Sequence, residues 1–290
     1  MLSNDVMGVI ALAVVWVTTL LVAGAAAQRL VALAAQRRRM RPLAPGEVGV
    51  GLVEGDVAAG AGEIAVHRVE QVGRQAADDH DQRAIVFSDR SYAGEVLGGT
   101  LKQADGAEIH VAPALDAEVW LRAEAVRAAA ECPDSATFDS AYEQARKARG
   151  FARTVTAKAP EGARVWAFGE VRRGDPRTMR PWPDGKLLLA TFDPRGWCGA
   201  RITELAVFIV LVIAVAAGCT AIALYRPHFG LVSTIGGALC LAYFLLVQPA
   251  GTAVRDRALF PHEHVLRGSW VKGAEPREQK AAATLLKGAP

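Results

Sequence analysis

Three long runs of apolar residues constrain this chain more than any other feature of its sequence. They cover residues 6–27, 205–225 and about 231–248, and none of them contains Asp, Glu, Lys, Arg or His. An α-helix rises about 1.5 Å per residue, so roughly 20 such residues cross a hydrocarbon core of about 30 Å. A buried helix of a soluble protein rarely stays uncharged over this length. We therefore predict three transmembrane helices.

The connection between the second and third runs is short. It consists of residues 226–230, in which Pro227 lacks a backbone N–H and Gly230 tolerates a positive φ. These features predict a tight turn between antiparallel helices. Small residues four positions apart predict where the two helices pack closely: Ala214 with Gly218, and Ser233 with Gly237.

The first run ends in three alanines, at residues 25–27, which is also compatible with a cleavable signal peptide. A signal peptide begins with basic residues, however, and residues 1–5 contain Asp5 but no Lys or Arg. We therefore expect the first run to remain in the protein as a membrane anchor.

Basic residues gather on one side of the three predicted spans. They are Arg29, Arg37, Arg38, Arg39 and Arg41 after the first, Arg195 and Arg201 before the second, and Arg255 and Arg257 after the third. The turn at 226–230 contains only Arg226. The positive-inside rule then predicts an outer N-terminus, an inner segment 28–204, an outer turn and an inner tail, in the inner membrane. Recognition of anionic lipids by the arginines is the alternative interpretation.

Charge and composition exclude several classes of function. No ionisable residue lies inside a span, which disfavours a pump or transporter. The whole chain carries a formal charge of +3. Its segment 42–204 contains 20 Lys and Arg against 25 Asp and Glu, so the segment's charge is −5 and a nucleic-acid partner is not expected. Four cysteines are too few for a disulfide scaffold.

The segment between the first two spans is long enough for a soluble domain. Alternating apolar residues and turn signals predict strands at residues 48–53, 64–69, 84–87, 108–111, 164–171 and 186–192. We expect a helix from Asp116 to about Glu131, and a second from the Pro133–Ser135 break to about Arg149, ended by Gly150. The predicted fold class is an α+β membrane protein, with a β-rich domain that carries a helical insert.

The predicted organisation has five parts. They are a transmembrane helix at 1–27, an Arg-rich stem at 28–45, a soluble domain at 46–204, a transmembrane hairpin at 205–248 and a C-terminal tail at 249–290. We expect part of this tail, residues 267–287, to form a short amphipathic or disordered segment on the inner membrane surface.

Several stretches of the soluble segment resemble the GIDE-type, or beside-a-membrane, domain of mulan-type E3 ubiquitin ligases and their prokaryotic relatives. Residues 46–55 resemble the opening strand of that family, residues 105–113 its Asp-Gly signature, and residues 160–171 its late strand. Residues 186–192 would be the final strand before the next span. The resemblance covers about residues 25–204, and it implies a domain that lies close to a bilayer.

The chain departs from those ligases in the part that carries their chemistry. A RING module needs eight Cys and His ligands for two zinc ions, many of them in Cys-x-x-Cys pairs. The cysteines here, Cys132, Cys198, Cys219 and Cys240, form no such pair, and the tail offers only His262 and His264 around Glu263. The resemblance therefore does not carry ubiquitin-ligase activity to this chain.

Other candidate sites are weaker. The glycines at 49, 51 and 55 do not have the spacing of a nucleotide loop, and we expect them in a strand. Residues 78–81, Asp-Asp-His-Asp, form the densest set of possible cation ligands, but such residues are also common in solvated loops. Cys132 and Cys198 have no neighbouring base that marks a nucleophile. We expect Trp166, Trp182 and Trp197 to be core or interfacial residues.

These observations predict a binding or scaffolding protein that is tethered to the membrane, with the lipid bilayer and a protein at its surface as partners. The sequence identifies no catalytic residue, no metal ligand and no cofactor, and it does not define an oligomeric state. One alternative is a subunit of a ubiquitin-ligase-like system whose catalytic module lies elsewhere. A weaker alternative is an accessory subunit of a transporter or channel.

Overall fold

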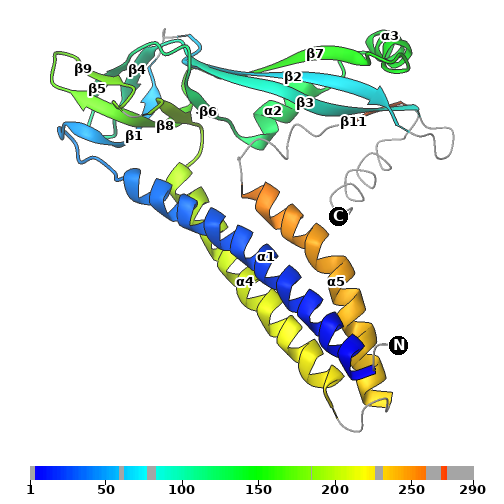
Figure 1. Cartoon of the computed structure of the whole chain (residues 1–290). Coiled ribbons are helices and arrows are strands. Elements are labelled where there is room, and N and C mark those ends of the chain that lie inside the picture. Colours follow the sequence, from blue (N-terminus) through cyan, green and yellow to red (C-terminus); the bar gives the residue numbers. More distant parts are fainter. Residues whose placement is uncertain are drawn as a thin grey trace. The chain divides into compact units, whose positions relative to one another are not determined.

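The computed structural model describes residues 4–58, 62–76, 83–183, 185–225, 231–258 and 269–272. Its contacts divide the chain into a helical unit, made of residues up to 38 and 196–260, and a β-rich unit, which contains residues 39–195 and the tail (Figure 1). The helices are α1 (Asn4–Arg39), α2 (Ala123–Ala130), α3 (Ser135–Ala145), α4 (Pro194–Ala223) and α5 (Leu231–Arg257). The strands are β1 (Gly49–Val57), β2 (Ala65–Gln75), β3 (Arg83–Val96), β4 (Gly99–Lys102), β5 (Glu108–Val111), β6 (Glu118–Trp120), β7 (Phe151–Ala159), β8 (Arg164–Arg172), β9 (Arg177–Arg180), β10 (Leu188–Ala190) and β11 (Ser269–Lys272).

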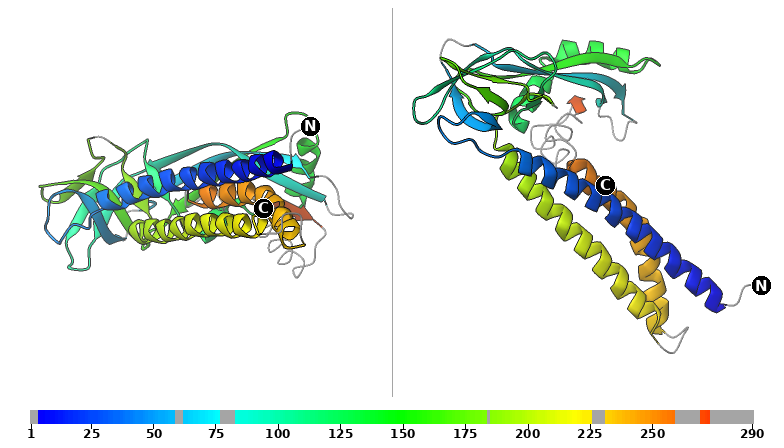
Figure 2. Two further views of the ribbon diagram at one scale, coloured as in Figure 1. Left: turned by 60° about the horizontal axis from the view of Figure 1, so that its bottom comes forward. Right: turned by 60° about the vertical axis from the view of Figure 1, so that its left-hand side comes forward.

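The helical unit contains three helices that are long and apolar enough to cross a membrane, as the sequence predicts. They are α1, α4 and α5, which lie side by side in both views of Figure 2. All three extend beyond the apolar runs, because α1 continues without a break to Arg39, α4 begins at Pro194 and α5 ends at Arg257. The predicted turn at 226–230 lies outside the described residues.

Polar side chains tie the three long helices together inside their apolar interface. The indole Nε1 of Trp16 donates to Thr220 Oγ1 at 3.1 Å. The hydroxyls of Thr19 and Tyr243 lie 2.8 Å apart, and Tyr243 also donates to the carbonyl of Val212. Thr19 and Thr220 each donate to the carbonyl four residues earlier, so these hydroxyls have protein partners, as a bilayer would require.

The predicted contact between the second and third spans is wrong. Ala214 and Gly218 are exposed on α4, and a Cβ at Gly237 would meet no atom within 4 Å. The close approach is at Gly236 instead, where a Cβ would lie 2.4 Å from the backbone nitrogen of Ala223. Two faces of α4 carry small residues, and their sequence spacing does not show which face meets α5.

Five strands of the β-rich unit close into a barrel. β1 pairs with β4, β4 with β5, β5 with β9, β9 with β8, and β8 again with β1. Only the β5–β9 pair is parallel. Numbered within the barrel, the strand order is 1-2-3-5-4-1, which is the Greek-key topology of OB-type barrels. This topology hosts many functions and does not identify one.

Two insertions leave the barrel and form a second sheet, whose order is β11-β3-β2-β7. The long hairpin of β2 and β3 is inserted between the first and second barrel strands. The segment β6–α2–α3–β7 is inserted between the third and fourth, and its helices pack on the second sheet, α2 against β7 and α3 against β2, β3, β7 and β11. Short β10 and β6 extend the barrel sheet beyond β8.

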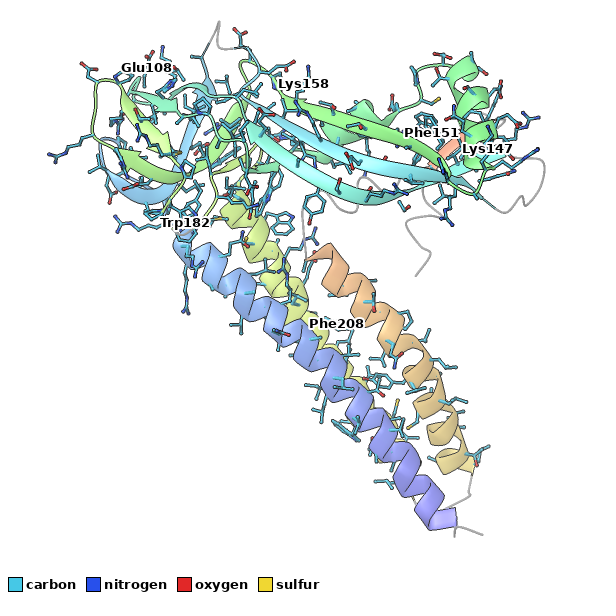
Figure 3. The ribbon with its side chains drawn as sticks, turned by 45° about the horizontal axis from the view of Figure 1, so that its top comes forward. Glu108, Lys147, Phe151, Lys158, Trp182 and Phe208 are labelled. Atoms are coloured by element: carbon cyan, nitrogen blue, oxygen red, sulfur yellow. The ribbon has the colours of Figure 1, made fainter. Side chains whose placement is uncertain are left out.

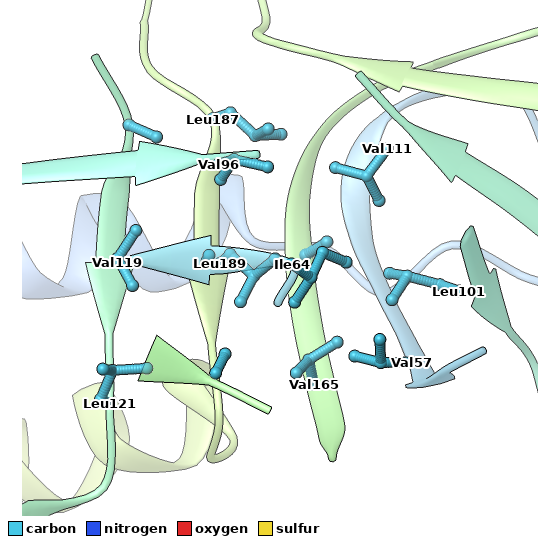
Figure 4. Packing of buried hydrophobic residues seen from close by; sticks show 14 of the residues in the cluster. Val57, Ile64, Val96, Leu101, Val111, Val119, Leu121, Val165, Leu187 and Leu189 are labelled. Carbon is cyan, nitrogen blue, oxygen red and sulfur yellow. The ribbon is translucent and has the colours of Figure 1, made fainter. Parts of the chain in front are cut away.

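One aliphatic core joins the barrel to the near end of the second sheet. The barrel contributes fully buried side chains such as Leu101, Val111 and Val165, and the hairpin contributes Ile64 and Val96 (Figure 4). At about 25 cal/mol per Å² of apolar surface, such burial is the main term that stabilises the domain. The far end of the second sheet has a separate aromatic cluster, which contains Phe87, Phe138, Tyr142 and Trp270.

The structure confirms the six predicted strands in outline and adds five. The predicted segments fall in β1, β2, β3, β5, β8 and β10, and the one at 108–111 matches β5 from end to end. The glycines at 49, 51 and 55 all lie in β1, as predicted. The additional strands are β4, β6, β7, β9 and β11. Residues 269–272 of the predicted amphipathic or disordered segment form strand β11, which pairs with β3, and the rest of the segment 267–287 lies outside the described residues.

The helix predicted to start at Asp116 is wrong in its first part. Residues Glu118–Trp120 form β6, which pairs in parallel with β10, and helix α2 covers only Ala123–Ala130. Pairing with β10 buries Val119 and Trp120, which outweighs the helical spacing. Asp116 caps no helix and accepts a hydrogen bond from Lys186 at 2.6 Å. The second predicted helix begins correctly, capped by Asp134, but it ends at Ala145.

Candidate ligand-binding site

The β-rich unit carries a pocket of about 340 Å³ on the outside of the barrel. Its walls come from five separate parts of the chain: the stem after α1, strand β1, the β4–β5 turn, strand β8 and the start of α4. The lining residues are Pro42, Leu43, Pro45, Leu52, Glu54, Gln103, Ala104, Asp105, Trp166, Asp193 and Arg195. We call this the stem pocket, and its volume is in the usual range for small-molecule sites.

The wall formed by the stem depends on a glycine in β1. Leu43 N–H donates to the carbonyl of Leu52, and Leu52 N–H donates to that of Arg41, so the stem pairs with the strand. A Cβ at Gly51 would lie 2.6 Å from Leu43 Cγ and 2.7 Å from the Arg41 carbonyl oxygen. Only glycine leaves room for this approach, which places residues 41–45 over the barrel.

The rim of the stem pocket is mainly acidic. Glu54 is ion-paired with Arg164, Asp105 accepts from the N–H of Ala107 at 3.0 Å, and Asp193 accepts from that of Arg195 at 2.9 Å. Each of these bonds uses one carboxylate oxygen. In the part of the chain that the structure describes, the half-buried guanidinium of Arg195 makes no hydrogen bond or ion pair. Three carboxylates against one guanidinium give the lining a net charge of −2.

The floor of the stem pocket is apolar and includes one aromatic ring. Trp166 is half-buried, projects outward from β8, and has the Arg164 guanidinium 5.9 Å from its ring centroid. We expected Trp166, Trp182 and Trp197 in core or interfacial positions. Trp182 is half-buried and packs edge-on against Phe168, with Arg39 over its ring at 5.6 Å. Trp166 differs because it lines a cavity.

A second polar cluster lies at the far end of the second sheet, around Arg153. Its Nε donates to Gln71 Oε1 and its Nη1 to the Ala130 carbonyl, both at 2.9 Å. Its Cζ lies 3.4 Å from the centroid of the Phe87 ring. Burial lowers the pKa of Arg153 to about 10, which still leaves the guanidinium charged at neutral pH. This cation holds β2, β7 and the end of α2 together.

The cysteines do not form a nucleophilic site. Burial raises the pKa of Cys132, despite the nearby Arg153, and its Sγ donates to the carbonyl of Asp134 at 3.3 Å. Cys198 is fully buried within α4. A thiol with a raised pKa is less often the reactive thiolate at neutral pH, so Cys132 lacks the activation that a nucleophile needs.

Among the described residues, no three His, Cys, Asp or Glu side chains lie close enough together to hold a metal ion. The cluster at 78–81 and the tail residues His262 and His264 lie outside the described residues. His67, which the sequence analysis did not single out, is 2% exposed, and burial lowers its pKa to about 4.

Several arginines that flank the predicted spans have partners within the protein. Arg29 Nε donates to the carbonyl of Ala258 at 3.0 Å within the helical unit. Arg39 stacks on Trp182, and Arg41 forms an ion pair with Glu47. Arg37 and Arg38 are exposed, while the side chains of Arg255 and Arg257 lie outside the described residues. Some of these cations therefore contribute to the fold as well as to the predicted orientation.

Comparison with known proteins finds no match for this chain among family models, curated proteins or solved structures. The resemblance to the GIDE-type domain therefore stays a prediction from short motifs, and the argument on function depends on the geometry of the chain itself.

Proposed function

We propose that this chain is a membrane-tethered binding protein whose stem pocket takes a small organic cation. One observation carries the proposal: the walls of the pocket include the residues that follow α1 and those that begin α4. A ligand in this pocket contacts both connections to the predicted spans. Occupancy can then change the constraint on both helices, which is what a ligand sensor at a membrane requires.

The chemistry of the lining supports a cationic ligand. An ammonium group gains from the acidic residues Glu54, Asp105 and Asp193, and from the face of the Trp166 ring. A short carbon chain fits the apolar wall of Leu43 and Leu52. Arg195, which lacks a partner among the described residues, suits a ligand that also carries an acidic group. Choline and phosphocholine are therefore suitable first probes.

The predicted orientation is part of this proposal. Strand β11 follows α5, and it pairs with β3, which precedes α4. This pairing requires the tail and the β-rich unit to lie on the same side of a membrane, and the even number of helices between them supports that. The arginine pattern favours the cytoplasmic side of the inner membrane. Reporter fusions after Arg41 and after Arg257 should then both report cytoplasm.

The binding proposal is tested with the full-length chain in lipid nanodiscs, titrated with choline chloride and with phosphocholine by calorimetry. Sodium chloride at equal ionic strength is the control for screening. We expect saturable binding that Trp166→Ala weakens at least tenfold and that Asp193→Asn weakens less. The matched control is Glu63→Gln, an acidic residue outside the pocket that pairs with Lys158. Equal heats for wild type and Trp166→Ala would contradict the proposal.

A further inference from the structure

Four residues of the tail form a strand on the edge of the second sheet. Residues Ser269–Lys272 pair antiparallel with Arg83–Val86, in the register Trp270 with Ile85 and Lys272 with Arg83. The two strands are far apart in the sequence, because β11 follows the last long helix, α5, whereas β3 precedes α4. A short strand added to a sheet edge is the geometry by which many domains bind extended peptides.

The side chain of Trp270 fills a socket that the rest of the unit forms. Its ring is 9% exposed and lies 5.1 Å from the centroid of Phe87 and 6.0 Å from that of Phe151. Figure 3 labels Phe151 at the far end of the second sheet. The Arg153 guanidinium lies 4.5 Å from the indole centroid. The indole Nε1 donates to the Ala130 carbonyl at 2.8 Å, so both the apolar and the polar parts of the ring are recognised.

A second set of contacts recognises Lys272, which lies two positions after Trp270. Lys272 forms an ion pair with Asp139 of α3, and its Nζ lies 6.0 Å from the centroid of Phe138. Residues two apart on a strand point to the same face, so Trp270 and Lys272 enter the site together. The recognised pattern is therefore Trp-x-Lys in an extended segment.

The socket does not depend on the tail for its own construction. Arg153 is held by Gln71 and by the Ala130 carbonyl, both of which belong to other parts of the unit. Phe87 and Phe151 pack edge to face at 6.4 Å. The tail contributes only four paired residues, and a strand of that length is marginally stable without its side-chain contacts.

We infer that this socket is a strand-recognition site for Trp-x-Lys segments, and that the chain's own residues 269–272 are an exchangeable occupant. The same segment from a second copy of the chain fits the site equally well. The covalent link favours the resident tail by raising its effective concentration. The inference is independent of the stem pocket, which shares no residue with the socket.

The test uses the full-length chain in nanodiscs and a fluorescent peptide of residues 267–274, followed by anisotropy. The double variant Trp270→Ala, Lys272→Ala empties the socket while leaving its walls intact. We expect it to bind the peptide at least tenfold more tightly than wild type does. A peptide with the W270A change should bind at least tenfold more weakly, whereas a V271T peptide, altered on the opposite face, should bind within about twofold. Equal binding of the W270A and unchanged peptides would overturn the inference.

A second measurement avoids any change in the socket or in its occupant. A protease site is placed in the segment 259–268 of the full-length chain, and the tail is cut after the protein has folded. We expect the fragment to remain bound on purification and to be released by excess unlabelled peptide. A fragment that leaves without competitor, or one that stays despite a hundredfold excess, would contradict an exchangeable strand.

Discussion

The closed barrel and the second sheet differ in how they pair the backbone N–H and C=O groups of their edge strands. The barrel strands pair in a closed circuit, so the barrel itself needs no strand from elsewhere. The second sheet is open, and one of its edges is completed by β11, which comes from the tail. Its interior also changes along its length, from aliphatic near the barrel to aromatic and charged near β11.

This difference shows that two parts of one unit depend on different lengths of the chain. The barrel strands all lie within residues 49–180, whereas one edge of the second sheet is paired by residues 269–272, beyond the last long helix. We therefore expect the barrel to set the global stability of the unit, and the tail to control a local part of the second sheet.

The largest expected effect is in the barrel core. Ile109 is fully buried in β5, and Ile109→Ala leaves a cavity among aliphatic neighbours. We expect a loss of about 2–5 kcal/mol in the free energy of unfolding of the whole unit, measured by urea titration and circular dichroism. Val50→Ala, at an exposed position of β1, is the control and should change stability by less than about 0.5 kcal/mol. A loss of stability confined to the second sheet would contradict the expectation that the barrel sets the global stability.

The next largest expected effect is a loss of folding stability at acidic pH, which comes from His67 in the second sheet. Burial lowers the pKa of His67 from 6.5 to about 4. Between these pH values the unfolded chain binds a proton that the folded chain does not, so the stability falls as the pH falls. At 1.36 kcal/mol per unit, the loss from this residue approaches roughly 3 kcal/mol near pH 4.

The pH effect is measured by unfolding at several pH values between 7 and 4.5. Carboxylates also titrate in this range, so the informative quantity is the difference between wild type and His67→Leu. We expect the stability of the variant to depend less steeply on pH. Parallel curves for the two proteins would show that His67 does not couple acid to unfolding.

A smaller and local effect is expected from the tail. Trp270→Ala removes the indole from its socket, so the β3–β11 pairing should open more often. We expect the amides of β11 that donate to β3 to exchange hydrogen roughly tenfold to a hundredfold faster, with little change in β1, β5 and β8. Hydrogen exchange with mass spectrometry measures both regions in one experiment. Faster exchange throughout the barrel would show that the two regions are one cooperative unit.

The smallest effect concerns the helix that covers the second sheet. Asp134 caps α3, where its carboxylate accepts from the N–H of Thr137 at 2.7 Å and from its hydroxyl at 2.9 Å. Asp134→Ala removes both bonds, and we expect a local loss of about 1 kcal/mol, measured as faster hydrogen exchange in α3. Asp134→Asn keeps an acceptor at the cap and should retain most of the stability. A loss as large as that of Ile109→Ala would mean that α3 belongs to the global core.

Local patterns in the sequence predict part of this architecture. The apolar runs and the alternation in β5 and β8 are visible within short windows, and these elements were found. The local sequence of β6 predicts a helix, because the segment becomes a strand only through its pairing with the distant β10. Strand β11 has four residues, and its partner lies almost two hundred positions earlier in the chain. Neither pairing has a local signal.

The candidate sites were harder to predict for the same reason. The stem pocket brings together residues 42–45, 103–105 and 193–195, and no motif links them. The sequence alone predicts Trp166 as a core or interfacial residue. It lines a pocket because Gly51 allows the stem to lie over the barrel. Arg153 is one basic residue among many in the sequence, and only the fold surrounds it with Phe87, Gln71 and the end of α2.

The most direct test of the account is where the full-length chain lies in the cell. Membranes are pelleted, washed with alkaline carbonate and then extracted with detergent. Because three helices are long and apolar enough to span a bilayer, the account predicts that the chain stays in the washed pellet and dissolves only with detergent. Recovery of the folded chain in the carbonate wash would contradict the membrane tether, and with it the proposed role of the stem pocket.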